Sequence, residues 1–395
     1  MRPSIPIPRT VLALGLVSFF MDVSSETIHA LLPLFLTGTL GVSVAAVGLI
    51  DGVAESTAAI SKVFSGYLSD KSGRRKPLIL FGYGLGALTK PLFAIAGGPL
   101  VVMAARFADR IGKGLRGAPR DALVADVTPT EIRGKAFGLR QALDTAGAFT
   151  GPLLAIALMA LFANDMRAVF WVAVIPAVLA VGCVLLGVEE RAGKANNIGA
   201  RPPVRQSDLA QFNGAFWIVV TIGVVFTLAR FSEAFLVLRA NREGLPLALA
   251  PLVLVVMNIV YALGAYPAGV LSDRMPPARL LLGGLFALIG ADLALALLPG
   301  LVGAFLGIAM WGLHMAMTQG LLAKLVADHA PDHLRGSAFG EFNLATGVAL
   351  LFASVVAGLV WDQFGPPATF LTGASLAALA GVLVIASQKG LVASR

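Results

Sequence analysis

The chain has 395 residues, of which 57% are hydrophobic and only 13% are charged, and its mean hydropathy is +0.84. Soluble domains carry about twice that share of charge, so the composition excludes a soluble globular protein; its hydrophobicity excludes a disordered one. Long continuous apolar blocks exclude a transmembrane β-barrel and predict an all-α membrane protein.

The net charge of +8 would suggest a nucleic-acid partner in a soluble protein. In a membrane protein, basic residues collect in cytoplasmic loops, so we expect no nucleic acid. The single cysteine, Cys183, lies in an apolar run, which excludes a disulfide framework and a thiolate metal site. The chain contains no P-loop, which disfavours ATP-driven transport, and we expect no cofactor.

Apolar blocks separated by charged residues, proline and glycine predict twelve membrane-spanning helices, the first of them retained rather than cleaved as a signal peptide. The predicted spans are 11–37, 44–69, 77–97, 99–120, 136–162, 168–187, 213–239, 247–272, 279–298, 301–325, 337–361 and 367–387. The one long polar stretch divides them six and six and is typical of a linker. We therefore predict a six-helix bundle at 1–187, a cytoplasmic linker at 188–212 and a second bundle at 213–395.

The basic residues of the loops predict the orientation. Seventeen lie in loops on one side, whereas three, Arg167, Arg239 and Arg242, lie on the other. The positive-inside rule then places both termini and the linker on the cytoplasmic side of the membrane. We expect this membrane to be a plasma membrane of the bacterial inner-membrane type.

The two halves share an internal repeat. The sequence LVADVTPTEIRGKAFG at 123–138 recurs as LVADHAPDHLRGSAFG at 325–340, at an offset of 202 residues, and GYLSD at 66–70 recurs as GVLSD at 269–273. Both halves keep the same predicted topology, which indicates a parallel repeat about an axis normal to the membrane.

The loop after span 2 carries a family motif. Its residues Gly66, Asp70, Gly73, Arg74 and Arg75 match a Gly, three residues, Asp, two residues, Gly, Arg, basic pattern. On this motif and over nearly the whole chain, the sequence resembles the major facilitator superfamily of secondary transporters. The resemblance implies twelve helices in two pseudo-symmetric halves. Asp70 before a turn, followed by three consecutive bases, suggests a cytoplasmic latch that forms when the halves close on that side; simple positive-inside charge is the alternative.

Span 5 adds a second motif. Gly138, Gly147, Gly151 and Pro152 resemble the signature of the exporter branch of the family, although Ala155 and Ile156 replace its last two glycines. Small residues on one face let helices approach closely in lipid, and a Gly-Pro step bends a helix. This span is either a hinge of an antiporter or an element of packing alone.

Ionisable residues at membrane depth are costly and mark function by default. The predicted proton-coupling and substrate pathway comprises Asp22, Glu26, His29, Asp51, Glu55, Lys90, Asp109, Arg110, Lys113, Asp144, Arg230, Glu233, His314 and Glu341. We expect the charged faces of spans 1 and 4 to neutralise each other, since unpaired charge cannot stay in a bundle. For any one of these residues, a structural ion pair is the alternative. The family resemblance implies that Arg110, with Asp22 or Glu26, takes part in proton coupling.

These features predict a secondary transporter that exports a small polar or ionic solute against protons by alternating access. Proton-coupled uptake of a small anion or metabolite is the alternative. The run from Phe20 to His29 is similar to the first span of bacterial nickel and metal-resistance exporters, so a metal ion, a metal chelate or a drug are the candidate solutes. Pro331 separates His329 from His333, so we assign no metal site. The partners expected are substrate, protons and the bilayer, for a functional monomer that is neither an enzyme nor a receptor.

Overall fold

The computed structural model describes residues 6–72, 74–190, 209, 211–331 and 334–392. Within these residues, eleven helices are long and apolar enough to cross a membrane. The predicted all-α membrane protein is therefore confirmed. The fourth predicted span is the helix α5 (Pro99–Val127), which has a charged residue in nearly every turn and is not among the eleven. The full twelve-span arrangement thus stays a prediction.

The chain divides into two compact units. The first comprises Met1–Leu32 and Thr57–Pro202, and the second comprises Pro33–Ser56 and Pro203–Arg395. The first half of helix α3 (Val44–Ser72) is thus grouped with the C-terminal helices. Residues 191–208 and 210 of the predicted linker lie outside the described part of the chain, and the predicted bundle boundaries stay predictions.

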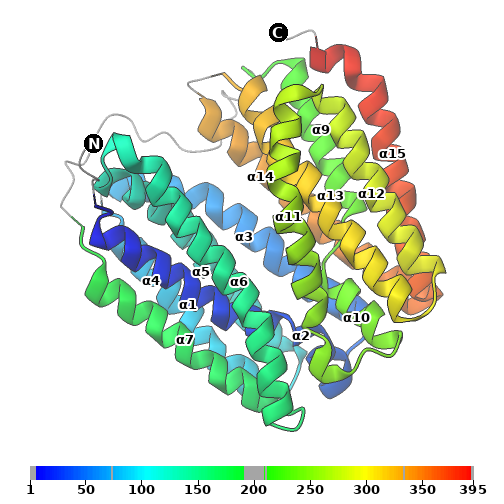
Figure 1. Cartoon of the computed structure of the whole chain (residues 1–395), viewed down its shortest axis with the longest axis horizontal. Helices are drawn as coiled ribbons and strands as arrows, with labels where there is room; N and C mark the ends of the chain where they lie inside the picture. The colour runs from blue at the N-terminus through cyan, green and yellow to red at the C-terminus, as the bar shows by residue number, and fades with distance from the viewer. Residues whose placement is uncertain (1–5, 73, 191–208, 210, 332–333, 393–395) are drawn as a thin grey trace. The chain divides into compact units, whose positions relative to one another are not determined.

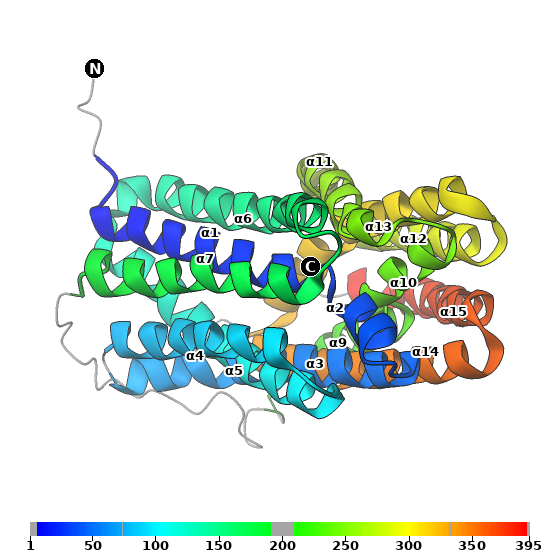
Figure 2. The ribbon, with the colours of Figure 1, turned by 90° about the horizontal axis from the view of Figure 1, so that it is seen from below.

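The first unit is a bundle of long helices around an apolar core. Besides α5 and the second half of α3, its helices are α1 (Arg9–His29), α4 (Lys76–Ile95), a short 3-10 turn η2 (Thr130–Ile132), α6 (Arg133–Leu161) and α7 (Met166–Gly187). Helix α1 packs against α6 and α7, and α4 packs against α5 and α7 (Figure 2). Leu14, Val17, Tyr83 and Val124 are among the buried core residues.

The second unit is built in the same way. Its elements are α2 (Leu32–Leu34), a π-helical turn η1 (Phe35–Thr39), the first half of α3, α9 (Gly214–Ala229), α10 (Ala234–Arg242), η3 (Leu247–Leu249), α11 (Leu252–Arg274), α12 (Pro277–Leu297), α13 (Gly300–His329), α14 (Arg335–Phe364) and α15 (Pro366–Val392). Helix α12 packs against α13 and α15, whereas α9 packs against α14 and α15 (Figure 1).

Both units expose apolar side chains that a water-soluble protein would bury. Leu186 of α7 is 90% exposed, and Val302 of α13 and Phe286 of α12 are 85% and 75% exposed. Large exposed apolar surfaces of this kind mark contact with a partner or a membrane. Because the helices satisfy their own backbone hydrogen bonds, these faces are suited to hydrocarbon.

The predicted seventh span, 213–239, is not one helix. It breaks between α9 and α10, and the hydroxyl of Ser232 accepts a hydrogen bond from the first backbone N–H of α10 at 3.1 Å. A serine hydroxyl that accepts from the backbone N–H two residues later favours a local turn over continuation of the helix. Apolar content alone does not locate the break, because apolar residues continue through it from α9 into the first turn of α10.

The same region corrects the assignment of Arg239. The loop count placed this residue outside the membrane helices, but it lies buried in α10. Its Nε donates to the backbone oxygen of Leu295 at 2.7 Å, and its guanidinium forms an ion pair with Glu243. Arg239 therefore joins α10 to α12 and is not a free loop charge.

Candidate functional site

Helix α1 carries the acidic face that the sequence predicts. Asp22, Ser25, Glu26 and His29 recur at helical spacing and are partly buried. The Nδ1 atom of His29 lies 3.4 Å from Oε2 of Glu26. The charges that act on Glu26 also include Lys113 and Arg110 of α5. Glu26 is thus one predicted residue that the fold brings into electrostatic range of the predicted arginine.

Asp22 lies one helical turn before Glu26, in a more mixed environment. The charges that act on its carboxyl are those of Asp144, Lys113, Arg116 and Glu26. Two of these are acidic and two are basic. A carboxyl group placed between opposing charges responds to any change in their positions. This is the electrostatic requirement for a group that exchanges a proton during a conformational cycle.

Two motif glycines of α6 hold that helix against the acidic face of α1. A Cβ atom at Gly151 would lie 2.8 Å from Cβ of Glu26, and one at Gly147 would lie 3.1 Å from Cβ of Asp22. The hydroxyl of Thr27 donates to the backbone oxygen of Gly151 at 3.0 Å, which fastens the crossing. The small residues are therefore needed for close approach next to the acidic pair. A Cβ at Gly138 would meet nothing within 4 Å, so that glycine has no such role.

A buried ion pair joins α4 to α5. Nζ of Lys90 lies 2.8 Å from Oδ1 of Asp109, and the two side chains are only 2% and 5% exposed. Nζ of Lys90 also donates to Oγ of Ser25 at 2.9 Å, so this pair is connected to the polar face of α1. The sequence predicts both residues in the pathway, and the structure shows that they bind each other.

Basic side chains follow one face of α5. Arg106, Arg110 and Arg116 are 4%, 3% and 5% exposed, whereas Lys113 is exposed. The guanidinium of Arg116 lies over the ring of Tyr83, 4.5 Å from its centroid, an arrangement that stabilises a buried cation. The three buried arginines outnumber the buried Asp109, so the buried face of α5 is basic.

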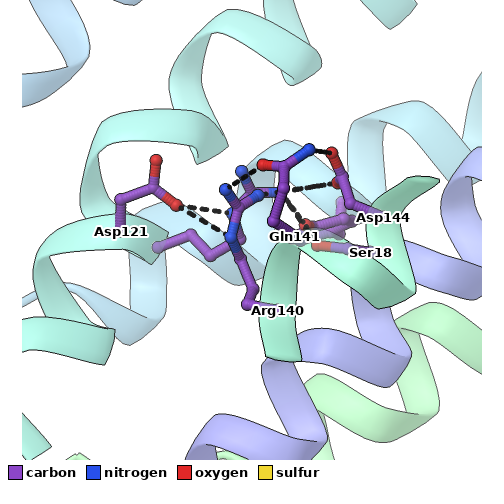
Figure 3. A network of polar contacts seen from close by, with 7 residues as sticks. Ser18, Asp121, Arg140, Gln141 and Asp144 are labelled. Carbon is purple, nitrogen blue, oxygen red and sulfur yellow. Dashed lines mark hydrogen bonds and ion pairs between the residues drawn. The ribbon is translucent and has the colours of Figure 1, made fainter. Parts of the chain in front are cut away.

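Nearer the expected cytoplasmic end lies a network that joins α1, α5 and α6 (Figure 3). Arg120 donates to Ser18 at 2.8 Å and to Asp121 at 3.1 Å, and it lies 3.5 Å from Asp144. Arg140 lies 3.6 Å from Asp144 and 3.7 Å from Asp121. Only Asp144 was a predicted site residue; the sequence signal that could have found Arg120 and Arg140 was their position within the predicted spans 99–120 and 136–162.

The motif loop is described in part. Gly66 and Asp70 lie in the last turns of α3, but the side chain of Asp70, and Gly73 altogether, lie outside the described residues. Nε of Arg75 forms an ion pair with Oδ2 of Asp126 at 2.6 Å. The latch role of Asp70 therefore stays a prediction. Its neighbour in the loop, Arg75, is bound to Asp126 of α5.

The far end of α7 also binds this loop. The carboxylate of Glu190 accepts hydrogen bonds from the backbone N–H groups of Arg75 and Lys76, and Nζ of Lys76 donates to the backbone oxygen of Val188 at 2.6 Å. Glu190 thus satisfies backbone donors at the start of α4, where a carboxylate is favoured. Sequence reasoning placed Glu190 in the linker and missed this contact.

The predicted site residues of the second unit form smaller groups. Oδ2 of Asp51 accepts a hydrogen bond from Ser232 at 2.8 Å, beside Glu233 at the break between α9 and α10. His314 is buried and lies 2.8 Å from the backbone oxygen of Gly284, and the charge of Arg230 acts on it. The structure places Glu55 on α3 and Glu341 on α14, both partly exposed.

The start of α3 is fastened to the end of α14. Oδ1 and Oδ2 of Asp362 accept hydrogen bonds from the backbone N–H groups of Val44 and Ala45, at 3.1 and 2.8 Å. A Cβ atom at Gly358 would lie 2.6 Å from Cα of Ala45, so the two helices cross at close range. Asp362 was not among the predicted site residues, because it follows the last residue of the predicted span 337–361 and was therefore expected to lie in a loop.

Among the residues that the structure describes, no group of three or more histidine, cysteine, aspartate or glutamate side chains comes together as a metal site. The polar interior of the first unit consists of ion pairs and hydrogen bonds. It is suited to bind and move charge, within helices that span a membrane.

The comparisons with known proteins agree with this picture. The family model described as Major Facilitator Superfamily matches residues 14–352. The chain belongs to this family. Members of the Major Facilitator Superfamily are transporters and not enzymes, so the predictions of a multi-pass membrane transporter without enzymatic activity are confirmed.

Three similar proteins illustrate the match. An uncharacterised MFS-type transporter of Methanocaldococcus jannaschii is 30% identical over 388 residues, which cover 96% of this chain and 95% of the relative. The gentisate transporter of Corynebacterium glutamicum is 27% identical, over 88% of this chain and 81% of its own. The solved structure of a mutant peptide transporter, POT, in complex with sulfate has a TM-score of 0.81 at 15% identity, over 98% of this chain and 96% of that one. The last shows the fold alone.

Proposed function

We propose that this protein is a proton-coupled secondary transporter that exports a small polar or ionic solute by alternating access. The observation that carries the proposal is the acidic face of α1. Asp22 and Glu26 lie partly buried in a membrane helix, at a close crossing with α6 and within range of the basic face of α5. Ionisable residues inside a membrane are energetically costly, and those that occur there usually have a function.

Coupling would follow from competition for one carboxyl group. Glu26 in its ionised form is stabilised by His29, Lys113 and Arg110. A proton on Glu26 removes its charge and weakens those interactions, so a proton and a cationic group or metal ion of the solute compete for the same carboxylate. Solute that binds from the cytoplasmic side then displaces the proton, and a proton that binds from the other side displaces the solute. Asp22 is the second candidate for this exchange.

Uptake of a small anion by symport is the second candidate function. It is favoured by the basic face of α5, on which Arg106, Arg110, Lys113 and Arg116 outnumber Asp109. It is also favoured by the similarity to the gentisate transporter, whose named solute is a carboxylate. Guanidinium groups bind carboxylates with two parallel hydrogen bonds, so a basic interior suits such a solute. The exporter proposal extends to metal ions, metal chelates and drugs, as the similarity of span 1 to metal-resistance exporters suggests.

We further propose that the protein acts as a monomer in a plasma membrane of the bacterial type, with both termini and the linker in the cytoplasm. The support is the loop charge count. If Arg239 is no longer counted as a loop residue, the ratio of basic residues between the cytoplasmic and the outer loops becomes larger, because Arg239 was one of the three on the outer side.

A single assay separates the two directions. Everted membrane vesicles are acidified inside by respiration, and a fluorescent dye reports the pH gradient. Gentisate, nickel ion and a lipophilic dye cation are then added one at a time from outside, the former cytoplasmic face. An antiporter exports the solute into the vesicle and releases protons, so the gradient collapses. A symporter responds only when the solute is loaded inside the vesicles.

Two substitutions test the coupling residues once one solute gives a signal. Glu26→Gln and Asp22→Asn should keep solute binding but remove its dependence on pH. Asp165→Asn, an exposed change at the N-cap of α7, is the matched control, because asparagine can accept the same backbone hydrogen bonds. If both single variants and the double variant still move the solute uphill at the wild-type rate, the proton is carried elsewhere, and Glu55 and Asp109 are the next residues to test.

A further inference from the structure

The second unit contains a buried carboxyl group that the proposed function does not use. Asp292 of α12 is 0% exposed. A Cβ atom built at Gly373 of α15 would lie 2.7 Å from its Oδ2 and 3.0 Å from Cε1 of Phe231. The carboxyl group is therefore enclosed between α12 and α15, beside the aromatic ring of Phe231.

Neither oxygen of Asp292 has a hydrogen-bond partner among the described residues. The indole Nε1 of the neighbouring Trp311, which packs on Phe231 with ring centroids 5.5 Å apart, also has none. Buried polar atoms are satisfied in the great majority of cases, and each exception calls for an explanation. Here two unsatisfied groups lie against the same phenylalanine.

The charged groups around Asp292 are engaged elsewhere. On α10, Arg239 binds the backbone of α12 and pairs with Glu243. On α13, His314 is bonded to Gly284, and Arg230 at the end of α9 acts on His314. The tyrosines of α11 are partly or largely exposed, and α15 has no titratable residue between Pro366 and Ser387. Among the described residues, no cation is paired with the carboxyl group.

The internal repeat shows what stands at this position in the first unit. A Cβ at Gly82 would meet Gly112 and Arg116, and one at Gly284 would meet His314 and Thr318. Each of these three residues has its counterpart 202 positions later, so α4 packs on α5 in the same register as α12 on α13. That register relates Lys90 to Asp292, and Asp109 to Trp311.

The two units therefore treat one buried position in opposite ways. In the first, the ammonium of Lys90 neutralises Asp109 at 2.8 Å. In the second, an acid stands in place of the ammonium, and an indole stands in place of its counter-ion. An isolated carboxylate in an apolar interior is so unfavourable that the group takes up a proton instead.

We propose that Asp292 is a proton-binding site of the second unit and that its carboxyl group holds a proton in the conformation described here. The enclosure by Gly373 and Phe231 favours a proton over a hydrated cation, because both oxygens are buried. The proton does not have to be the one that drives transport. The inference is therefore independent of the proposed direction, solute and coupling residues, and it is tested without a solute.

Infrared spectroscopy of the purified protein in lipid at pH 7.5 tests the proposal. A protonated carboxyl group has a C=O stretch that is separate from the carboxylate bands and shifts in heavy water. We expect Asp292→Asn to remove one such band. Asp165→Asn is the matched control, since its carboxyl group is exposed and its loss should leave the protonated band unchanged.

Two outcomes would overturn the proposal: a protonated band that Asp292→Asn leaves intact, or loss of a carboxylate band in its place, which would mean that Asp292 is ionised and paired with a cation. If this variant does not fold, wild-type protein labelled with carbon-13 on aspartate gives the answer, because a spectrum with no protonated aspartate at pH 7.5 also refutes it. Failure of the vesicle assay for export would leave this result untouched, so the two proposals fail separately.

Discussion

Removal of one partner from the Lys90–Asp109 pair should be far more damaging than removal of both. At the observed 2.8 Å separation, the attraction between two unit charges is about 6 kcal/mol with an effective dielectric constant of about 20. Desolvation of each ion costs several kcal/mol, so the pair contributes little net stability. A lone buried charge, however, keeps the desolvation cost and loses the attraction.

Lys90→Met should therefore lower the free energy of unfolding by ~3–5 kcal/mol, and Asp109→Leu by a similar amount. The double variant Lys90→Met with Asp109→Leu should recover most of the loss, because two apolar side chains of similar volume replace the two ions. The non-additivity between the single and double variants is then several kcal/mol, well above the value for independent sites.

The assay is unfolding of the purified protein in mixed micelles with increasing SDS, followed by circular dichroism. The matched control is the Arg75–Asp126 pair, whose side chains are 22% and 52% exposed. Arg75→Gln should cost less than ~1 kcal/mol, as is usual for exposed ion pairs. If Lys90→Met costs no more than this control, or if the double variant is as unstable as the sum of the single ones, water reaches the pair and the reasoning is wrong.

Three further predictions concern packing, topology and the motif loop. Gly151→Val should destabilise the first unit by ~1–3 kcal/mol in the same assay, because its side chain would collide with Glu26, whereas Gly138→Ala should be tolerated; equal effects would contradict the close crossing of α1 and α6. A reporter enzyme that is active only outside the membrane should give no signal at the C-terminus, and a strong signal would reverse the predicted topology. Asp70→Asn should impair transport while expression and solute binding stay near wild type; unchanged transport would reduce the motif loop to a topology signal.

The class of this protein and much of its local structure were predictable from the sequence. Whether a segment is apolar enough to span a membrane depends only on its own residues, so the positions of the apolar helices follow directly from the local composition. Helical periodicity likewise places Asp22 and Glu26 on one face of α1 without reference to any other helix. The motif around Arg74 and Arg75 pointed to the family that the comparison then showed.

Only the tertiary structure decided which charged faces meet. The sequence predicted that the charges of spans 1 and 4 neutralise each other, and cations of α5 do act on Glu26 of α1; it did not predict the direct buried pair of Lys90 of α4 with Asp109 of α5. The rotation of each helix about its axis, and thus the partner of each charge, depends on side-chain packing with neighbours that are remote in sequence. The glycines of α6 show the same dependence, since Gly147 and Gly151 contact α1 but Gly138 does not.

The break in span 7 and the isolation of Asp292 have the same physical origin. At the break, the hydroxyl of Ser232 accepts from the first N–H of α10 and donates to Asp51, which is far away in the chain. Asp292 looks in the sequence like one more charge in an apolar helix, and its environment depends on where Phe231 and Gly373 lie. Sequence periodicity determined which residues enter the membrane helices, whereas long-range packing determined which of their charges are paired.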